Sequence, residues 1–256
     1  MQFWLGTHRP NWLQKADVPL MVSHRTLGDY KRLPRANGPW VLDSGGYSEL
    51  SMYGEWRTAV RAYVRAVKRY SEEVGGLEWA AVQDWMCEPW IIRKTGLDIS
   101  EHQYRSVVSY LELRLRAPDL PWCPVLQGWE PDDYLRHRDL YEQAGVRLAD
   151  LPIVGIGSVC RRQSVRGAID LLVHLSGSGI RLHGFGLKTT ALRSLASFLA
   201  SSDSMAWSYE AMKRGVHCGE PPVPCANHLH YALDWREDVL ASMDTVPFQL
   251  GFPLVA

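Results

Sequence analysis

The segment VLDSGGYSEL, residues 41–50, combines residue types that could do chemistry. Two apolar residues run directly into Asp43, and two glycines and Tyr47 follow at once. A tight turn would account for Asp-Ser-Gly-Gly, because these residues favour turn conformations. A small pocket would account for it as well, with a carboxylate in its wall, glycines that clear space and an aromatic ring for a flat ligand. The rest of the sequence decides between the two interpretations.

Short apolar runs recur along the chain, and most are followed by a helical pattern. The runs are nearly continuous rather than alternating, which is typical of strands buried on both faces. Eight such strands with intervening helices predict a parallel (β/α)8 barrel of the TIM type, formed by one domain over residues 1–256. The predicted strands cover residues 2–6, 18–23, 39–43, 77–84, 123–127, 152–157, 180–186 and 203–208, and the predicted helices cover residues 56–73, 103–116, 131–145, 164–176 and 189–200.

Two features of this α/β pattern leave alternatives open. The first two connections are too short for full helices, so an incomplete or distorted barrel is compatible with the sequence. A doubly wound open sheet is the main alternative, but no GxGxxG fingerprint follows the first predicted strand.

The ends of the predicted strands are rich in polar and ionisable residues. In a parallel barrel these ends meet at a single mouth, where the chemistry of such folds takes place. A pocket therefore becomes the favoured interpretation of the segment around Asp43. The residues at these ends are His8, His24, Arg25, Asp43, Asp84, Gln127, Gly157, Ser158, Lys188 and Asp203.

Six motifs, in this order along the chain, resemble those of the tRNA-guanine transglycosylases. The similarity spans roughly residues 40 to 240 and is strongest to the short branch that acts in 7-deazaguanine modification of DNA. It implies an α/β barrel with a zinc-binding insertion, and cleavage of the N-glycosidic bond of a nucleotide. The motifs are LDSGGY (42–47), VQDWMCEP (82–89), VLQGW (125–129), VGIGSV (154–159), HGFGL (183–187) and SSDSMAWS (201–208).

The resemblance also implies a role for individual residues. Asp203 would be the nucleophile, Asp43 the general acid and base, and Tyr47 a ring that stacks on the base. This division suits the chemistry, because one carboxylate can stabilise or trap the sugar while a second carboxyl group protonates the departing base. The predicted base-binding residues are Ser44, Gly45, Gly46, Tyr47, Asp84, Gln127, Gly128 and Gly157.

The motif around the predicted nucleophile departs from the family pattern. The family often carries Asp-x-x-Asp on this strand, whereas this chain has Asp203 followed three residues later by Ala206. If the family nucleophile aligns with the second position, Asp203 must act from a neighbouring position. The sequence leaves this choice open.

A cluster of cysteine and histidine predicts a structural zinc site in an insertion at residues 215–236. Four nitrogen and sulfur ligands in a tetrahedral shell are typical of such sites, and a short loop poor in apolar residues gains stability from a metal. Chance clustering of free cysteines and surface histidines is the alternative. The predicted ligands are Cys218, Cys225 and His228, with His230 or His217 as the fourth. We expect no organic cofactor.

Charge and composition limit the partners of the chain. Lys and Arg together number 28, as do Asp and Glu, so a nucleic-acid site has to be a local cationic patch. No segment approaches a membrane span, no signal peptide is recognisable, and an odd number of cysteines, five, favours a reducing cytoplasm. The predicted phosphate contacts are His8, His24, Arg25, Arg161, Arg162 and Lys188, each of which also has a purely structural interpretation.

The sequence therefore favours an enzyme that uses a pair of aspartates to cleave the glycosidic bond of a flipped, modified base in nucleic acid. The base is either removed, which would leave an abasic site, or exchanged for another. We expect DNA rather than tRNA as substrate, because little sequence follows the predicted barrel. The alternatives are a tRNA base transglycosylase, a hydrolase of free nucleosides, and a binding module without activity.

Overall fold

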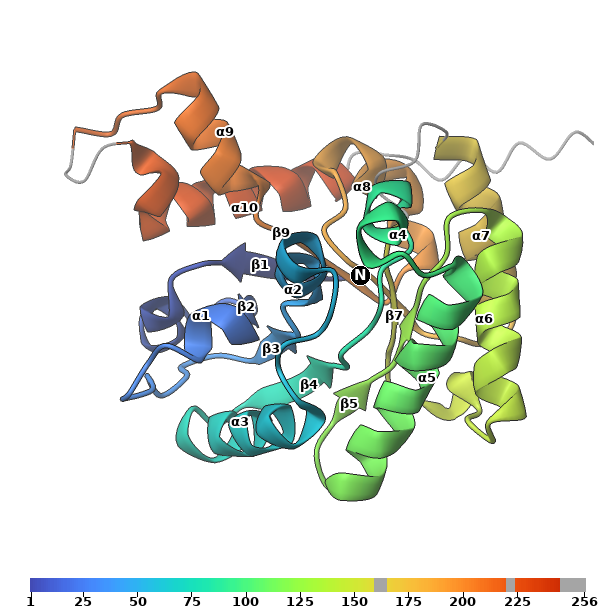
Figure 1. The fold of residues 1–256 in the computed structure, drawn as a ribbon. Coiled ribbons are helices and arrows are strands. Elements are labelled where there is room, and N and C mark those ends of the chain that lie inside the picture. The colour runs from blue at the N-terminus through green and yellow to red at the C-terminus, as the bar shows by residue number, and fades with distance from the viewer. Residues whose placement is uncertain (159–164, 220–223, 245–256) are drawn as a thin grey trace, which may run out of the picture.

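The computed structural model describes residues 1–158, 165–219 and 224–244, and its strands form one sheet that curls into a nearly closed barrel (Figure 1). All its strand pairs are parallel, and the order of strands is β5-β4-β3-β2-β1-β9-β8-β7-β6. The strands are β1 (Gln2–Thr7), β2 (Leu20–Ser23), β3 (Trp40–Asp43), β4 (Leu77–Ala81), β5 (Trp122–Cys123), β6 (Val125–Leu126), β7 (Val154–Ile156), β8 (Leu182–Gly184) and β9 (Ser201–Ser204).

The barrel closes through β5 and β6, which are two parts of one continuous strand. Pro124 separates them because its nitrogen carries no hydrogen to donate to a neighbouring strand. The Cys123 carbonyl accepts the N–H of Val82 at 3.1 Å on one side, and the Pro124 carbonyl accepts the N–H of Gly155 at 2.8 Å on the other. Counted in this way the barrel has the eight strands of a (β/α)8 fold, as the sequence predicts.

Helices surround the barrel and connect its strands (Figure 1). The first two connections contain only the 3-10 helix Pro10–Gln14 and the single turn of α1, so their predicted shortness is confirmed. The helices are α1 (His24–Leu27), α2 (Gly46–Tyr53), α3 (Val60–Glu73), α4 (Pro89–Thr95), α5 (Ile99–Arg116), α6 (Pro131–Gln143), α7 (Val165–Gly177), α8 (Thr189–Leu195), α9 (Ala206–Arg214) and α10 (Leu229–Asp244). Within the described residues no helix is both long and apolar enough to span a membrane.

Helix α3 shows how the apolar pattern positions a layer against the barrel. Tyr63, Val67 and Tyr70 recur at helical spacing and are buried. The Tyr63 hydroxyl donates to the carbonyl of Ala81 at 2.7 Å, so the buried polar atom is satisfied at the end of β4. The helix predicted over residues 56–73 is thus present as Val60–Glu73 and packs against the barrel through these buried side chains.

The last predicted strand, residues 203–208, was wrong in position. The strand is β9, Ser201–Ser204, and the residues from Ala206 onwards form α9. A run of serines and an aspartate does not have the apolar character by which strands were recognised. These polar residues are buried nevertheless, because they form hydrogen bonds with the neighbouring strand β8. The Ser202 hydroxyl donates to the Gly184 carbonyl at 2.8 Å.

A substitution at Gly155 of β7 tests how tightly the barrel is packed. A methyl group at this position would clash with the ring of Phe185 and lie 3.2 Å from Cγ2 of Val125. We expect Gly155→Ala to lower the free energy of unfolding by about 1–3 kcal/mol, measured by denaturant titration. The control is Gly177→Ala at the end of α7, where an added Cβ meets no heavy atom within 4 Å. Equal midpoints for both variants would contradict the packing of β7.

Candidate active site

A cavity of about 290 Å3 opens at the carboxyl ends of the barrel strands. Its size suits a single heterocyclic ring, since it lies at the lower limit of ligand pockets. A larger hollow of about 480 Å3 lies at the opposite end of the barrel, but none of the predicted site residues lines it. The cavity is lined by Gly6, Thr7, Met21, Ser23, Asp43, Ser44, Gly46, Tyr47, Asp84, Met86, Glu88, Gln127, Gly157, Ser158, Phe185, Gly186, Asp203 and Met205.

Asp43 is the last residue of β3, and the turn that follows holds its carboxylate. Gly45 has the left-handed φ of 82°, and its N–H donates to Oδ2 of Asp43 at 3.2 Å. Desolvation raises the pKa of Asp43 to about 6; hydrogen bonds from Ser23 and Gly45 oppose this shift, and the charge of Asp203 adds to it. Asp43 can therefore release or take up a proton near neutral pH.

Asp84 is part of a buried chain of polar groups across the cavity. The Gln127 side-chain amide donates to Oδ2 of Asp84 at 2.5 Å, and the Ser158 hydroxyl donates to Oε1 of Gln127 at 2.9 Å. Desolvation raises the pKa of Asp84 to about 7, and it outweighs the hydrogen bond from Gln127, which lowers this pKa. At Gly157 a Cβ would clash with the Gln127 carboxamide, so only glycine leaves room for this contact.

Ser158 holds the outer end of this chain in an unusual backbone conformation. It is the one non-glycine residue in the described ranges with a positive φ, 62°. Such a conformation costs energy and is retained where the surrounding contacts require it. Here it places the Ser158 hydroxyl against Gln127 and thereby orients the amide that faces the cavity.

Asp203 reaches the cavity from β9 and is held by β8 and the residues after it. The N–H of Gly186 donates to Oδ1 of Asp203 at 2.8 Å, and Nε2 of His183 lies 3.4 Å from the same oxygen. Ala206, by contrast, begins α9 and does not line the cavity. The carboxylate that this strand presents to the cavity is therefore that of Asp203.

His183 is a residue of this site that sequence reasoning missed. It is fully buried, with ring centroids 4.7 Å from Trp79 and 4.5 Å from Phe185, and its Nδ1 lies 2.9 Å from the Ser201 hydroxyl. Its motif, HGFGL, was recognised, but nothing in a single sequence says that a histidine in a strand points inward toward a carboxylate on the next strand. Met86, Glu88, Phe185 and Met205 of the cavity wall were also not predicted.

Tyr47 stands at the mouth of the cavity. It lies in the first turn of α2, is 47% exposed, and packs edge-on against Trp90 with ring centroids 5.7 Å apart. Gly46, beside it, approaches the wall closely, since a Cβ there would lie 3.1 Å from the Trp56 ring. The ring and the small residue thus shape one side of the cavity.

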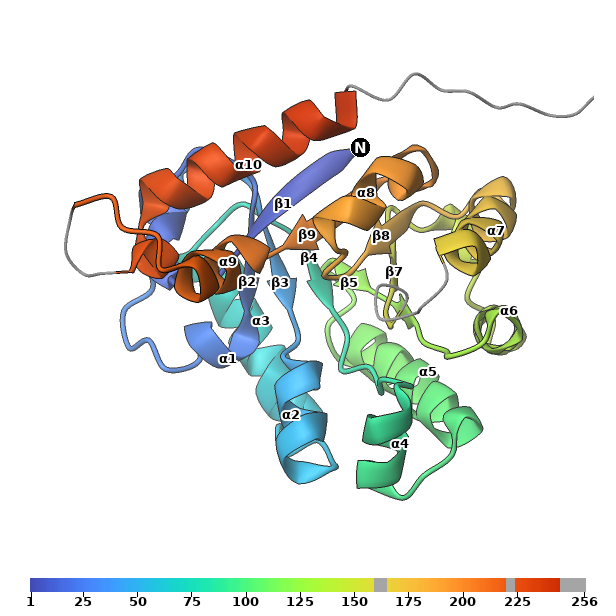
Figure 2. The same ribbon diagram turned by 90° about the horizontal axis from the view of Figure 1, so that it is seen from above.

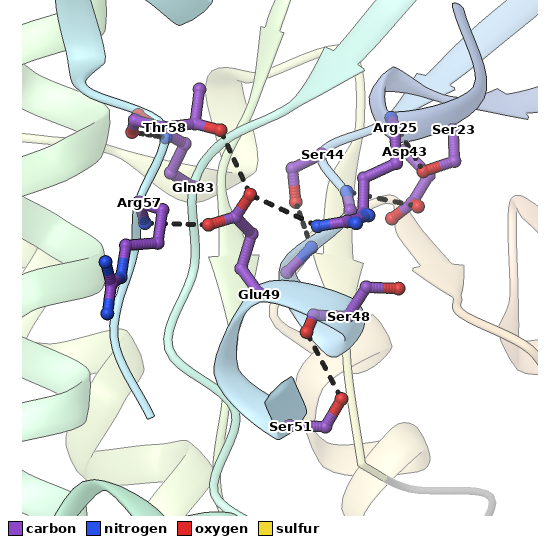
Figure 3. A network of polar contacts seen from close by, with 12 residues as sticks. Ser23, Arg25, Asp43, Ser44, Ser48, Glu49, Ser51, Arg57, Thr58 and Gln83 are labelled. Atoms are coloured by element: carbon purple, nitrogen blue, oxygen red, sulfur yellow. Dashed lines mark hydrogen bonds and ion pairs between the residues drawn. The ribbon is translucent and has the colours of Figure 1, made fainter. Parts of the chain in front are cut away.

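The turn before α2 is fixed by a network around the buried Glu49 (Figure 3). Glu49 accepts the backbone N–H of Arg57 at 2.7 Å and the hydroxyl of Thr58 at 3.1 Å, and it forms an ion pair with Arg25 at 3.5 Å. The aliphatic part of Arg25 lies over Gly45, where an added Cβ would come within 2.8 Å of its Cγ. Arg25 therefore supports the turn beside Asp43.

Other predicted phosphate contacts have partners within the protein or lie elsewhere. His8 is hydrogen-bonded to Asn227 at 2.9 Å, and His24 to the Tyr70 hydroxyl at 3.0 Å. Lys188 is exposed just before α8 and does not line the cavity, while Arg161 and Arg162 lie outside the described residues.

Gly128, predicted as a base contact, packs instead against α6, where a Cβ would lie 2.7 Å from Cβ of Asp133.

Three of the predicted metal ligands lie together. Ligand atoms of Cys218, His228 and His230 are all within 4.8 Å of one another, and Sγ of Cys218 lies 3.0 Å from Nδ1 of His228. Cys225 adjoins this group, because its Sγ accepts the backbone N–H of Cys218 at 3.1 Å. His217 is exposed and does not belong to the group. The donor set of thiolate and imidazole fits a zinc ion.

The barrel and its cavity define the class of the protein: a (β/α)8 barrel with three aspartates and a glutamine at the carboxyl ends of its strands. The chain belongs to the family described as DpdA, DeoxyPurine in DNA protein A, whose sequence model matches residues 1–250. This is the transglycosylase-like family of 7-deazaguanine DNA modification, so the resemblance is confirmed and the chain is a base-transferring enzyme. No curated protein matches the chain.

The raised pKa values of Asp43 and Asp84 make the stability of the fold depend on pH. A carboxyl group whose pKa is higher in the folded than in the unfolded state stabilises the fold below its unfolded pKa, and this stabilisation is lost as pH rises through the folded pKa. For Asp84 this stabilisation is lost between about pH 4 and about pH 7. We expect Asp84→Asn, which stays neutral, to gain stability relative to the wild type between pH 4 and pH 8, by up to roughly 4 kcal/mol.

Denaturant titrations of both proteins across this pH range measure the difference. The control is Asp119→Asn, which removes a carboxylate from an exposed position outside the cavity. A difference for Asp84→Asn that does not change with pH would show that the Asp84 carboxylate is not destabilised by its surroundings.

Proposed function

We propose that this enzyme exchanges a base in DNA for a 7-deazaguanine through a covalent sugar–enzyme intermediate. The observation that carries the proposal is the convergence of Asp43, Asp84, Asp203 and Gln127 on one cavity of the size of a single base. The target nucleotide has to leave the stack of bases before it can enter such a cavity.

Asp203 supplies the nucleophile. Its carboxylate, oriented by the Gly186 N–H, attacks C1′ of the target nucleotide; a C–O bond forms, the C1′–N bond breaks, and its electron pair stays on the departing base. Asp43, whose pKa of about 6 lets it carry a proton, protonates that base. The ionised Asp43 then takes a proton from the incoming base, which attacks C1′ and releases the Asp203 carboxylate.

The chain of Asp84, Gln127 and Ser158 recognises the edge of the base, and Tyr47 stacks on its face. The amide of Gln127 offers a donor and an acceptor, and Asp84 can serve as acceptor or, when protonated, as donor. A site built from buried hydrogen-bonding groups discriminates strongly, because a base without matching groups would leave them unpaired. The glycines at positions 46 and 157 keep the cavity open for a flat ring.

DNA is the favoured substrate because the description of the family refers to DNA. Exchange in tRNA, removal of the base without replacement, and hydrolysis of free nucleosides use the same first step. These alternatives differ in the polymer that is bound and in the group that attacks the intermediate, so the products distinguish them.

The decisive experiment supplies labelled 7-deazaguanine together with duplex DNA. We expect the label to enter the DNA with the wild type. Asp203→Asn should lower kcat/KM by about 10³-fold or more, since it removes the nucleophile, and Asp43→Asn by about 10²–10⁴-fold, since it removes the proton donor. Wild-type enzyme quenched in denaturant during turnover should carry covalently bound DNA, which Asp203→Asn should lack.

Other products would contradict exchange. Alkali-labile abasic sites without incorporation would indicate a glycosylase, and label in tRNA alone would assign the enzyme to RNA. Label that enters DNA at an undiminished rate with Asp203→Asn would remove this residue from the mechanism.

We also propose that the cysteine–histidine group holds a structural zinc ion. Cys218, His228 and His230 would be ligands, and Cys225 is the natural fourth because its sulfur adjoins Cys218. Nδ1 of His228 is the nitrogen that would face the ion, since it lies 3.0 Å from Sγ of Cys218. The ion would fix the 3-10 helix Cys225–Asn227 and the start of α10 against α9.

Cys218→Ser tests this site. We expect the purified wild type to contain about one zinc per chain by atomic emission, and the variant to lose it together with part of its thermal stability. His217→Ala is the matched control, since His217 neighbours the group in sequence but lies outside it. Equal zinc content in the Cys218→Ser variant would contradict the assignment.

A further inference from the structure

Helices α2 and α4 extend side by side past the strand ends, next to the cavity (Figure 2). Both are additional to the helices that cover the barrel wall, and each begins beside the cavity, at Gly46 and just after Glu88. They share a hydrophobic cluster that is separate from the barrel core. Its buried residues are Leu50, Trp85 and Ile91, and Trp56, Met86, Trp90 and Leu97 pack against them.

The two helices end together and form a compact tip, which we define as residues 52–57 and 93–96. Gly54 and Gly96 end them with left-handed φ values of 69° and 73°. A Cβ on Gly54 would lie 2.9 Å from the carbonyl oxygen of Lys94, so the two ends are in direct contact. The tip is therefore held both by its shared cluster and by this close approach.

The surface of the tip combines apolar and cationic side chains. Met52 and Tyr53 are 55% and 41% exposed, although nothing in the chemistry of the cavity requires them. The guanidinium of Arg57 lies 5.2 Å above the Tyr53 ring, and Arg93 and Lys94 are exposed on α4.

One acidic residue of the tip faces these cations. Glu55 pairs with Arg57 at 2.8 Å, but both side chains are more than half exposed, and such pairs contribute little. The tip therefore keeps a positive balance beside its apolar side chains. Rings and thioethers among cations suit a nucleic acid, because bases contact the apolar groups and phosphates the cations.

We propose that this tip enters the DNA duplex beside the target nucleotide, and that Met52 and Tyr53 occupy the space left when the base moves into the cavity. The inference rests on the proposed function. Tyr47 at the cavity and Tyr53 at the tip lie on one helix, about 9 Å apart along its axis at 1.5 Å per residue. One rigid helix thus contacts the flipped base at its start and the opened stack at its end.

A wedge of this kind compensates for the unstacking of a base, which a duplex requires and a single strand does not. The double variant Met52→Ala/Tyr53→Ala should therefore affect the reaction on duplex DNA but not the reaction on single-stranded DNA. We expect it to exchange the base in duplex DNA about 10- to 100-fold more slowly than the wild type. On a single strand of the same sequence it should stay within about twofold of the wild-type rate.

Leu115→Ala is the matched control, since Leu115 is 84% exposed near the end of α5, which the cavity does not involve. Thermal unfolding of all variants verifies the fold. A 2-aminopurine placed next to the target should brighten on binding of the wild type and less on binding of the double variant.

The cations of the tip give a second readout. Arg93→Ala/Lys94→Ala should weaken binding to duplex and single strand alike, and reduce the slope of log affinity against log salt by roughly one to two. An unchanged slope would show that these two residues do not contact phosphates.

Failure of this inference is distinguishable from failure of the proposed function. If the wild type exchanges bases in duplex DNA and the Met52→Ala/Tyr53→Ala variant does so equally fast, the wedge is overturned and the proposed function stands. Equal losses on duplex and single strand would also overturn the wedge. A wild type that modifies only tRNA, or no nucleic acid, would overturn both.

Discussion

The structure of this enzyme depends on the placement of three carboxyl groups around one small cavity. Asp43, Asp84 and Asp203 come from different parts of the barrel, and like charges in a buried space oppose one another. Their electrostatic interaction is evident in the pKa of Asp43, which the charge of Asp203 raises, and in that of Asp84, which the charge of Asp43 raises. The barrel therefore has to stabilise these carboxyl groups against their mutual repulsion.

The barrel offsets the repulsion by placing one hydrogen-bond donor at each carboxyl group. Asp43 accepts the N–H of Gly45, Asp84 the amide of Gln127, and Asp203 the N–H of Gly186. Two of these donors are backbone groups in glycine-containing segments at strand ends, so their positions are set by the barrel rather than by mobile side chains. Desolvation still dominates at Asp43 and Asp84 and favours their protonated forms, which reduces the total charge that the cavity has to hold.

Much of the fold and part of the site follow from local rules, and what could not be predicted has a physical reason. Apolar runs buried on both faces indicate strands, and residues at the ends of parallel strands meet, which is why the sequence brings Asp43, Asp84 and Gln127 to one mouth. Strand β9 was misplaced because its buried residues are polar and are stabilised by contacts with β8, which no local pattern encodes. His183 was missed for the same reason, since its partners, Ser201 and Asp203, belong to another strand.

The surroundings of the two predicted catalytic aspartates differ in a way that suits the different roles proposed for them. Asp43 accepts one backbone N–H from the turn that follows it and the hydroxyl of Ser23 at the end of β2. Its raised pKa suits a group that exchanges a proton. Asp203 accepts the Gly186 N–H, and Nε2 of His183 lies 3.4 Å from the same carboxylate oxygen. The His183 ring is itself fixed by Trp79, Phe185 and the Ser201 hydroxyl. A carboxylate that must attack one carbon atom benefits from a rigid position. A group that transfers a proton benefits from a pKa near the pH at which the enzyme works. The packing of β3, β8 and β9 therefore already gives the two carboxyl groups different surroundings before any substrate enters.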